Sequence, residues 1–210
     1  MNSLLIELQF LPPISYFMLV AGHDKIILER HEHYLKQSYR NRCYVKTSQG
    51  IEMLVVPVTS KHGKPKVTDV RIDYDQKWVN QHLRTLQTAY GKAPFFEFYM
   101  HDLTGILSKR FTYLYDLNFR LLSLCLSWLS MTPLVTESST YEKKPFSALI
   151  DRRNDITPKK NVIAATRGNN LPTYTQVFGS KFAGDLSIID LIFCKGPEAR
   201  SILQSPPTFE

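Results

Sequence analysis

Cysteine is scarce in this chain and forms no recognisable pattern. Cys43, Cys125 and Cys194 are odd in number, lie far apart and include no Cys-x-x-Cys pair. Disulfide scaffolds and structural zinc sites need paired or clustered cysteines. We therefore expect neither in this protein, and we predict no bound metal and no cofactor.

Long hydrophobic runs are also missing. The longest, at residues 121–129, is bounded by Arg120 and by Met131-Thr132-Pro133, and it falls well short of the roughly 20 apolar residues that span a bilayer. The apolar N-terminus has no basic region, and Glu7 and Pro12-Pro13 interrupt it, so it does not have the pattern of a signal peptide. We predict a cytoplasmic protein without a membrane span.

The bulk composition is that of an ordinary globular protein with a basic balance. A length of 210 residues predicts a single domain over residues 1–210. The 26 Lys and Arg residues exceed the 19 Asp and Glu residues, which suits nucleic acid, an anionic membrane surface or a phosphate-bearing metabolite. No helix-turn-helix, RNA-recognition or zinc-finger pattern is present, so nucleic acid is not the predicted partner.

The order of elements predicts the fold class. A strand over Ser3–Gln9, a helix over Ile14–Ala21 and a strand over Lys25–Glu29 form a βαβ pattern, which favours parallel pairing with a right-handed crossover. Further strands or extended segments are expected at 42–46, 52–58, 67–72, 134–137 and 171–178, and helices at 75–90, from 94 onwards, at 113–131 and at 186–193.

Three weaker expectations complete this pattern. Residues 138–160 are rich in Ser, Thr, Pro and charge and predict an exposed loop with part of a helix. Residues 162–165 form a strand or a hydrophobic anchor, and the last residues, from 204, should fray. We predict an α/β protein: a single three-layer domain around a mixed, largely parallel sheet.

The stretch from His31 to Cys43 is unusually dense in polar side chains and follows an apolar strand. Buried charges and amides need partners, so such a stretch is either a solvated edge or a pocket wall. His31 and His33, at i and i+2, would point the same way on a strand. We predict that one of them is a catalytic general base, since histidine titrates near neutral pH.

The same stretch supplies candidate substrate-binding residues. Guanidinium and ammonium groups hold phosphate or carboxylate, an aromatic ring can stack on a base or sugar, and an amide can donate and accept. The predicted set here is Lys36, Tyr39, Arg40, Asn41 and Arg42.

A second cluster of similar character begins at the head of the helix predicted at 75–90. Trp78 and His82, at i and i+4, share one helix surface and suit a pocket. A core position for Trp78 is the competing interpretation. Tyr90 and Lys92, at the end of that helix, complete the predicted binding set in this region.

Four short motifs in order resemble the WbqC-like family of bacterial proteins. They are Gln9-Phe10-Leu11-Pro12-Pro13-Ile14-Ser15-Tyr16-Phe17, the Tyr34–Arg42 segment, Tyr90-Gly91-Lys92-Ala93-Pro94-Phe95-Phe96, and Leu186–Phe193 with Gly196-Pro197-Glu198. The resemblance places His31, Lys36, Asn41 and Arg42 in the family's central polar motif, and Ser187 and Asp190 in its C-terminal motif. Where relatives show Gln-Pro and an aromatic residue, this chain has Gln9-Phe10-Leu11.

The resemblance implies a cytoplasmic protein associated with surface-polysaccharide and O-antigen gene sets. Our first hypothesis is a transferase that moves an acyl or aminoacyl group to a nucleotide-linked amino sugar. The alternative is a non-catalytic protein that binds an anionic glycan precursor or a partner protein. The expected partner is a small molecule, a nucleotide sugar; the donor and the oligomeric state are left open.

Overall fold

The computed structural model describes residues 2–59, 63–145, 149–159, 171–179 and 181–204. The predictions for residues 162–165 and for residues 205–210 lie outside the described residues.

A parallel sheet forms the base of the described fold. Its strands are β1 (Ser3–Glu7), β2 (Lys25–Glu29), β5 (Leu134–Glu137) and β6 (Leu149–Asp151), in the order β5-β2-β1-β6. All three pairings are parallel. The predicted α/β class and the predicted βαβ unit are confirmed.

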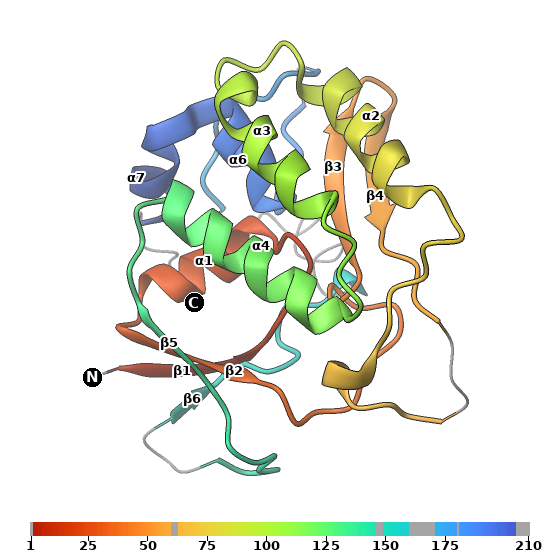
Figure 1. Cartoon of the computed structure of the whole chain (residues 1–210). Helices are drawn as coiled ribbons and strands as arrows, with labels where there is room; N and C mark the ends of the chain where they lie inside the picture. The colour runs from red at the N-terminus through yellow and green to blue at the C-terminus, as the bar shows by residue number, and fades with distance from the viewer. Residues whose placement is uncertain (1, 60–62, 146–148, 160–170, 180, 205–210) are drawn as a thin grey trace.

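Helices cover one face of this sheet. The chain steps from β1 to β2 through α1 (Ile14–Ala21) and from β2 to β5 through a longer connection that ends in α4 (Leu114–Trp128). Both steps run in the same direction across the sheet, so right-handed crossovers place α1 and α4 on the same side. Figure 1 shows both helices above the sheet.

Alternation along β2 matches this one-sided cover. Leu4, Ile6, Ile26 and Leu28 are almost completely buried. On the other face Ile27 of β2 is half-buried, while Leu5 of β1, at the centre of the sheet, is buried as well. A strand places successive side chains on opposite faces, so the fully buried set marks the face toward the helices.

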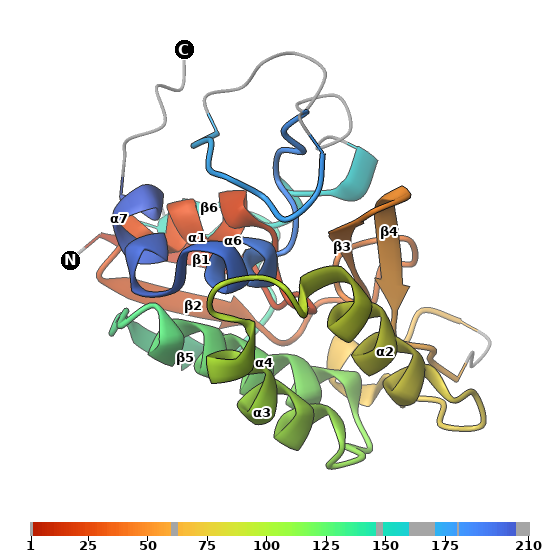
Figure 2. The ribbon, with the colours of Figure 1, turned by 90° about the horizontal axis from the view of Figure 1, so that it is seen from above.

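The remaining helices and a hairpin build the upper part of the molecule. The helices are α2 (Trp78–Tyr90), α3 (Phe96–Leu107), α6 (Ile188–Lys195) and α7 (Ala199–Leu203), with short 3₁₀ turns at Val67–Asp69 (η1) and Gly196–Glu198 (η2). β3 (Arg42–Thr47) and β4 (Gly50–Val55) pair antiparallel in a separate two-stranded sheet. Figure 2 shows this hairpin beside α2, away from the parallel sheet.

Two expectations about local structure were wrong. Residues 138–160, predicted as a loop, contain β6, which pairs with β1. Only two apolar residues, Leu149 and Ile150, mark this strand, and its partner β1 lies more than a hundred positions earlier in the chain. The segment at 67–72 begins as the turn η1 instead of extended chain, and only Arg71 and Ile72 form isolated bridges.

The C-terminal segment closes the fold against the N-terminal motif. The backbone N–H of Ile14 donates to Leu186 O at 3.0 Å, and that of Ser187 donates to Tyr44 O at 2.8 Å. From Ile188 to Cys194 every residue of α6 is buried. The start of α1, the start of α6 and β3 therefore lie together. No helix in the described ranges is both long and apolar enough to cross a membrane.

Candidate functional site

Each strand of the parallel sheet ends in a carboxylate. These residues are Glu7, Glu29, Glu137 and Asp151. Because the strands are parallel, all four carboxylates come from the same edge, and ligands of open α/β sheets bind outside that edge where the strand order reverses. Here the order reverses beside β1, which has β2 on one side and β6 on the other.

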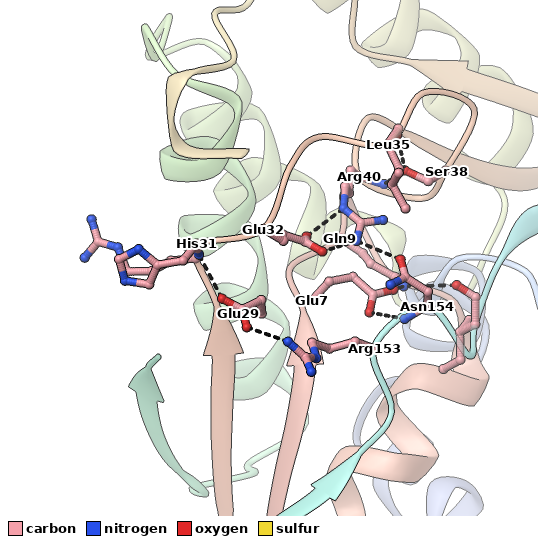
Figure 3. Close-up of polar contacts among 12 residues, drawn as sticks. Glu7, Gln9, Glu29, His31, Glu32, Leu35, Ser38, Arg40, Arg153 and Asn154 are labelled. Carbon is pink, nitrogen blue, oxygen red and sulfur yellow. Dashed lines mark hydrogen bonds and ion pairs between the residues drawn. The ribbon is translucent and has the colours of Figure 1, made fainter. Parts of the chain in front are cut away.

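We use the name carboxyl-edge cluster for Glu7, Gln9, Glu29, His31, Glu32, Arg40, Arg153 and Asn154 (Figure 3). Glu7 is 1% exposed and accepts hydrogen bonds from neutral donors: Gln9 Nε2 at 2.7 Å and the backbone N–H of Asn154 at 2.8 Å. Gln9 Oε1 is buried and has no hydrogen-bond partner within the described part of the chain.

Glu29 connects β2 with β6 and with the segment after β5. One carboxylate oxygen accepts from the backbone N–H of His31 at 2.8 Å and from the Ser138 hydroxyl at 2.7 Å. The other pairs with Arg153 Nη1 at 2.8 Å. Arg153 also holds Asp151, whose pKa it lowers by hydrogen bonding and charge. The ends of β2 and β6 are thus tied by one guanidinium.

Glu32 and Arg40 form a buried two-pronged ion pair. Arg40 Nε donates to Oε1 at 2.7 Å and Nη2 to Oε2 at 2.5 Å, while Nη2 also donates to Asn154 Oδ1 at 2.9 Å. Burial raises the pKa of Glu32, and the hydrogen bonds and charge of Arg40 oppose that rise. Glu32 therefore balances the charge of Arg40, and the phosphate-holding role predicted for Arg40 stays a prediction.

The two candidate bases lie in different surroundings. His31 is half-buried, and its Nε2 lies 3.1 Å from the carbonyl oxygen of Ser138. A carbonyl only accepts, so Nε2 carries the hydrogen and the neutral ring has its lone pair on Nδ1. His33 is exposed, and its Nδ1 contacts Lys64 O at 2.7 Å. Neither residue lies in a strand, so their i, i+2 spacing does not place the two side chains on one strand face.

The other residues of the polar stretch are spread over several environments. Lys36 is exposed. Tyr39 is buried, with its ring edge-on to Tyr44 at 5.9 Å between centroids. Asn41 donates from Nδ2 to Val56 O at 2.9 Å. Arg42 reaches across β3 and β4, where its Nη1 contacts the Met53 sulfur at 3.5 Å.

Trp78 and His82 line an open hollow of about 440 Å³ between β4 and the start of α2. We call it the α2 hollow. Its lining residues are Glu52, Met53, Leu54, Val55, Pro57, Val58, Gln76, Trp78, Gln81 and His82. The ring centroids of Trp78 and His82 lie 5.1 Å apart, with the rings edge to face. The two side chains therefore lie on one surface of α2, as their spacing predicts.

The C-terminal candidates form a separate buried network. Asp190 is fully buried and accepts hydrogen bonds from the Tyr90 hydroxyl at 2.6 Å, from the Tyr174 hydroxyl, and from Gln176 Nε2 at 3.0 Å. Burial raises the pKa of Asp190 and these donors lower it. Ser187 donates from its hydroxyl to Leu11 O at 2.8 Å. This network joins α2, the 171–179 segment and α6.

The structure thus places Trp78 and His82 in the wall of one hollow and pairs Tyr90 with Asp190. His31 and Arg40 lie near the carboxyl edge with separate partners, the Ser138 carbonyl for His31 and Glu32 for Arg40. Arg42 contacts Met53, which lines the hollow. Lys92 is exposed at the end of α2. In the described residues, no group of three or more His, Cys, Asp or Glu side chains could hold a metal ion. The roles assigned to the site residues stay predictions.

Sequence reasoning missed Glu7, Glu29, Arg153 and Asn154. A signal was available for the first two, because each is a carboxylate directly after an apolar run. Glu29 ends the predicted strand 25–29, and Glu7 lies near the end of the predicted strand 3–9, where a charged residue would face the ligand edge. No sequence signal marked Arg153 and Asn154, because they lie in a segment of mixed charge whose strand was not recognised.

Comparison with known proteins agrees with the motifs. A model of the WbqC-like protein family matches residues 9–170. This span contains the α2 hollow and all of the carboxyl-edge cluster except Glu7, and it ends before Ser187 and Asp190. A curated relative, "Uncharacterized protein Rv1507c" from Mycobacterium tuberculosis, is 33% identical over 140 residues, which are 66% of this chain and 60% of the relative. The chain therefore spans less than two thirds of that relative's length. No solved structure gave a significant match. With most of its length matched by the family model, this chain belongs to the WbqC-like protein family.

Proposed function

We propose that this protein is a cytoplasmic transferase that moves an acyl or aminoacyl group to the amine of a nucleotide-linked amino sugar during surface-polysaccharide biosynthesis of the O-antigen type. It acts as a single domain over residues 1–210. The family membership and the carboxyl-edge cluster support the proposal.

The observation that carries the proposal is the position of His31. Its backbone N–H is held by Glu29 at 2.8 Å and its ring Nε2 by the carbonyl of Ser138 at 3.1 Å. These contacts orient the ring and leave the Nδ1 lone pair for a proton. A half-buried histidine held in one tautomer at the carboxyl edge of a parallel sheet, where β2 and β5 end, is suited to general base catalysis.

The reaction moves one proton in two steps, from the amine to His31 and from His31 to the leaving group. The amine nitrogen of the sugar attacks the carbonyl carbon of an activated acyl donor, a thioester or ester, and Nδ1 of His31 takes the amine proton. The tetrahedral intermediate collapses, the bond to the donor's sulfur or oxygen breaks, and the leaving group takes the proton from His31. An amide and a free thiol or alcohol result, and the histidine is again neutral.

The closed ion pairs favour a second function. Arg40 and Arg153 both bind buried carboxylates, an arrangement that stabilises a fixed shape as well as it serves chemistry. A non-catalytic protein that recognises an anionic glycan precursor or a partner protein would bind it through the exposed Lys36 and the other polar residues of the same stretch, without turnover.

The test is a transfer assay with purified protein. Nucleotide-linked amino sugars are incubated with acyl or aminoacyl thioesters and esters, and the amide product is detected by mass spectrometry. We expect turnover by the wild type and a loss of about 100- to 10,000-fold in His31→Asn, the usual contribution of a general base. His101→Asn, on the exposed surface of α3, is the matched control and should keep full activity.

Two results would count against the transferase. If nucleotide sugars raise the melting temperature of the protein but no donor class gives a product, the binding function replaces it. If His31→Asn and His101→Asn are equally active, His31 is not the base.

A further inference from the structure

The β3–β4 hairpin has one uncovered edge. Within the described ranges β4 pairs only with β3, and Figure 2 shows β4 on the side of β3 that faces away from α6. From Gly50 to Met53 the strand is exposed. An uncovered strand edge presents a row of backbone donors and acceptors that can pair with another chain.

The pairing pattern of the hairpin identifies the backbone groups on this edge. The backbone N–H of Val56 donates to Asn41 O at 2.8 Å, so these opposite residues form a hydrogen-bonded pair. Such pairs occur at every second position of an antiparallel ladder, and Ile51 and Met53 fall at the positions between them. The N–H and C=O groups of Ile51 and Met53 therefore point away from β3, and they have no backbone partner among the described residues.

The contacts of β3 on its other side show the same alternation. Tyr44 O accepts from the backbone N–H of Ser187 at 2.8 Å, and the N–H of Lys46 donates to the Tyr90 hydroxyl at 3.1 Å. These groups of β3 thus point away from β4. The residues opposite them in β4 are the two whose backbone groups point outward.

The exposed edge is apolar and almost uncharged. Ile51 is 59% exposed and Met53 is 44% exposed, and as alternate residues they lie on one face of the strand. From Thr47 to Val55 the only charged residue is Glu52, and the segment contains no Lys and no Pro, the residues that commonly block pairing at strand edges. The net charge of +7 opposes self-association in general, so a nearly uncharged edge is a suitable place for two copies to meet.

The α2 hollow lies along the same edge. Its lining includes four consecutive residues of β4, Glu52–Val55. A pocket on one face of a strand contacts alternate residues, so a run of consecutive residues places the hollow beside the strand. The start of α2 forms the opposite wall, where Gln76 and Gln81 are exposed. The hollow therefore provides space next to β4 for part of another chain.

We propose that β4 pairs with β4 of a second copy of this chain, antiparallel and around a two-fold axis, so that the two hairpins form one four-stranded sheet. A two-fold interface brings the same patch of both copies together. The backbone groups on the free edge allow the axis to pass through Ile51, Glu52 or Met53.

Charge and burial select one of these registers. An axis at Glu52 sets two carboxylates opposite each other, which is destabilising. An axis at Met53 sets Ile51 against Val55 of the second copy, which is half-buried and whose backbone hydrogen-bonds the ring of His82. An axis at Ile51 avoids both conflicts.

The register centred on Ile51 uses the exposed features of the edge. The two Ile51 residues exchange a pair of backbone hydrogen bonds. Glu52 lies opposite Gly50 of the second copy, so no like charges meet. Met53 is diagonal to Ile51 of the second copy, within reach of a long side chain, and the four apolar side chains cover one another. The turn at residues 48–49 of the second copy follows the edge to Met53, at the α2 hollow.

Sedimentation velocity over a range of protein concentrations tests the association. The mass of the wild type should approach twice the chain mass of 24.3 kDa as the concentration rises. Ile51→Lys sets two cations opposite each other and should raise the dimer dissociation constant at least about tenfold. Phe98→Lys, on α3 and 75% exposed, is the same kind of change on another surface and should leave the constant unchanged. Circular dichroism and the melting temperature check that both variants fold.

Amide hydrogen exchange tests the pairing itself. The N–H of Ile51 should become protected as the protein concentration rises, since only the second copy accepts from it. The N–H of Glu52 bonds to β3 within one hairpin and should be protected at every concentration. Glu52→Gln should leave the dissociation constant unchanged; a stronger dimer would show that the axis passes through Glu52 and would contradict the register.

Other results would overturn the proposal. A chain that is monomeric at every concentration would leave this edge to an extended segment of a different protein. A dimer that Ile51→Lys leaves intact, or that Phe98→Lys dissociates, is formed through another surface. A dimer in which the Ile51 amide stays unprotected is not joined through β4. These measurements need no substrate, so this proposal and the transferase proposal can fail separately.

Discussion

The carboxyl-edge cluster and the α2 hollow differ in how their polar groups are satisfied. At the sheet edge, buried carboxylates face guanidinium groups: Glu32 meets Arg40 and Glu29 meets Arg153. In the hollow, the indole of Trp78 and the imidazole of His82 each have a buried atom without a partner in the described residues.

This difference predicts which polar groups stabilise the fold. The paired charges hold the strand ends in place, and losing one partner of a pair costs stability. Buried donors and acceptors without a partner cost stability in the folded protein itself. We therefore expect the largest stability effects at the edge.

Breaking the Glu32–Arg40 pair should produce the largest loss of stability. Arg40→Met leaves the Glu32 carboxylate buried without its cation, which typically costs about 3–5 kcal/mol. Urea titration measures this loss as a change in the free energy of unfolding. The control is Arg152→Met. Arg152 is 49% exposed and its ion pair with Asp155, at 3.2 Å, lies at the surface, so this variant should lose less than about 1 kcal/mol. Equal losses in both variants would show that the edge is no more than a solvated surface.

His82 should make stability depend on pH. Its pKa in the folded protein is about 4, below the ordinary value of 6.5, so the unfolded chain binds the proton first as the pH falls. The contribution of neutral His82 is complete above pH 6.5 and declines toward pH 4, by about 3 kcal/mol in total. Urea unfolding of the wild type and of His82→Gln at pH 7.5 and pH 4 measures it. A wild-type advantage that stays constant over this range would contradict a buried neutral ring.

The smallest effect is expected at the rim of the hollow. Glu52 is exposed and makes one long contact, 3.4 Å to the Thr85 hydroxyl. Glu52→Gln keeps the shape and removes the charge, so the free energy of unfolding should change by less than about 0.5 kcal/mol. The same substitution at Glu29, which is buried beside Arg153, gives the comparison. A loss at Glu52 as large as that at Glu29 would remove the distinction between rim and edge.

Part of the candidate site could be predicted from local patterns. Arg42, Trp78 and His82 were identified because charged and aromatic side chains stood close to strand and helix starts. The structure places Trp78 and His82 in the wall of one hollow and Arg42 in contact with Met53 of that wall. Tyr90 and Asp190 were named as separate candidates, and the hydrogen bond between them at 2.6 Å could not be foreseen, since a hundred residues separate them.

The sequence by itself determined the elements whose signals are local. The bounds of α1, β2 and β5 agree with the prediction, because apolar runs, Pro13 before the helix and Gly22 after it act within a few residues. Only the tertiary structure decided that β6 pairs with β1 and that Arg153 binds Glu29. It also decided that the backbone N–H of Asn154 donates to the Glu7 carboxylate. These contacts join residues more than a hundred positions apart, and each partner is chosen by the burial of charge and backbone in the folded sheet rather than by its neighbours in the chain.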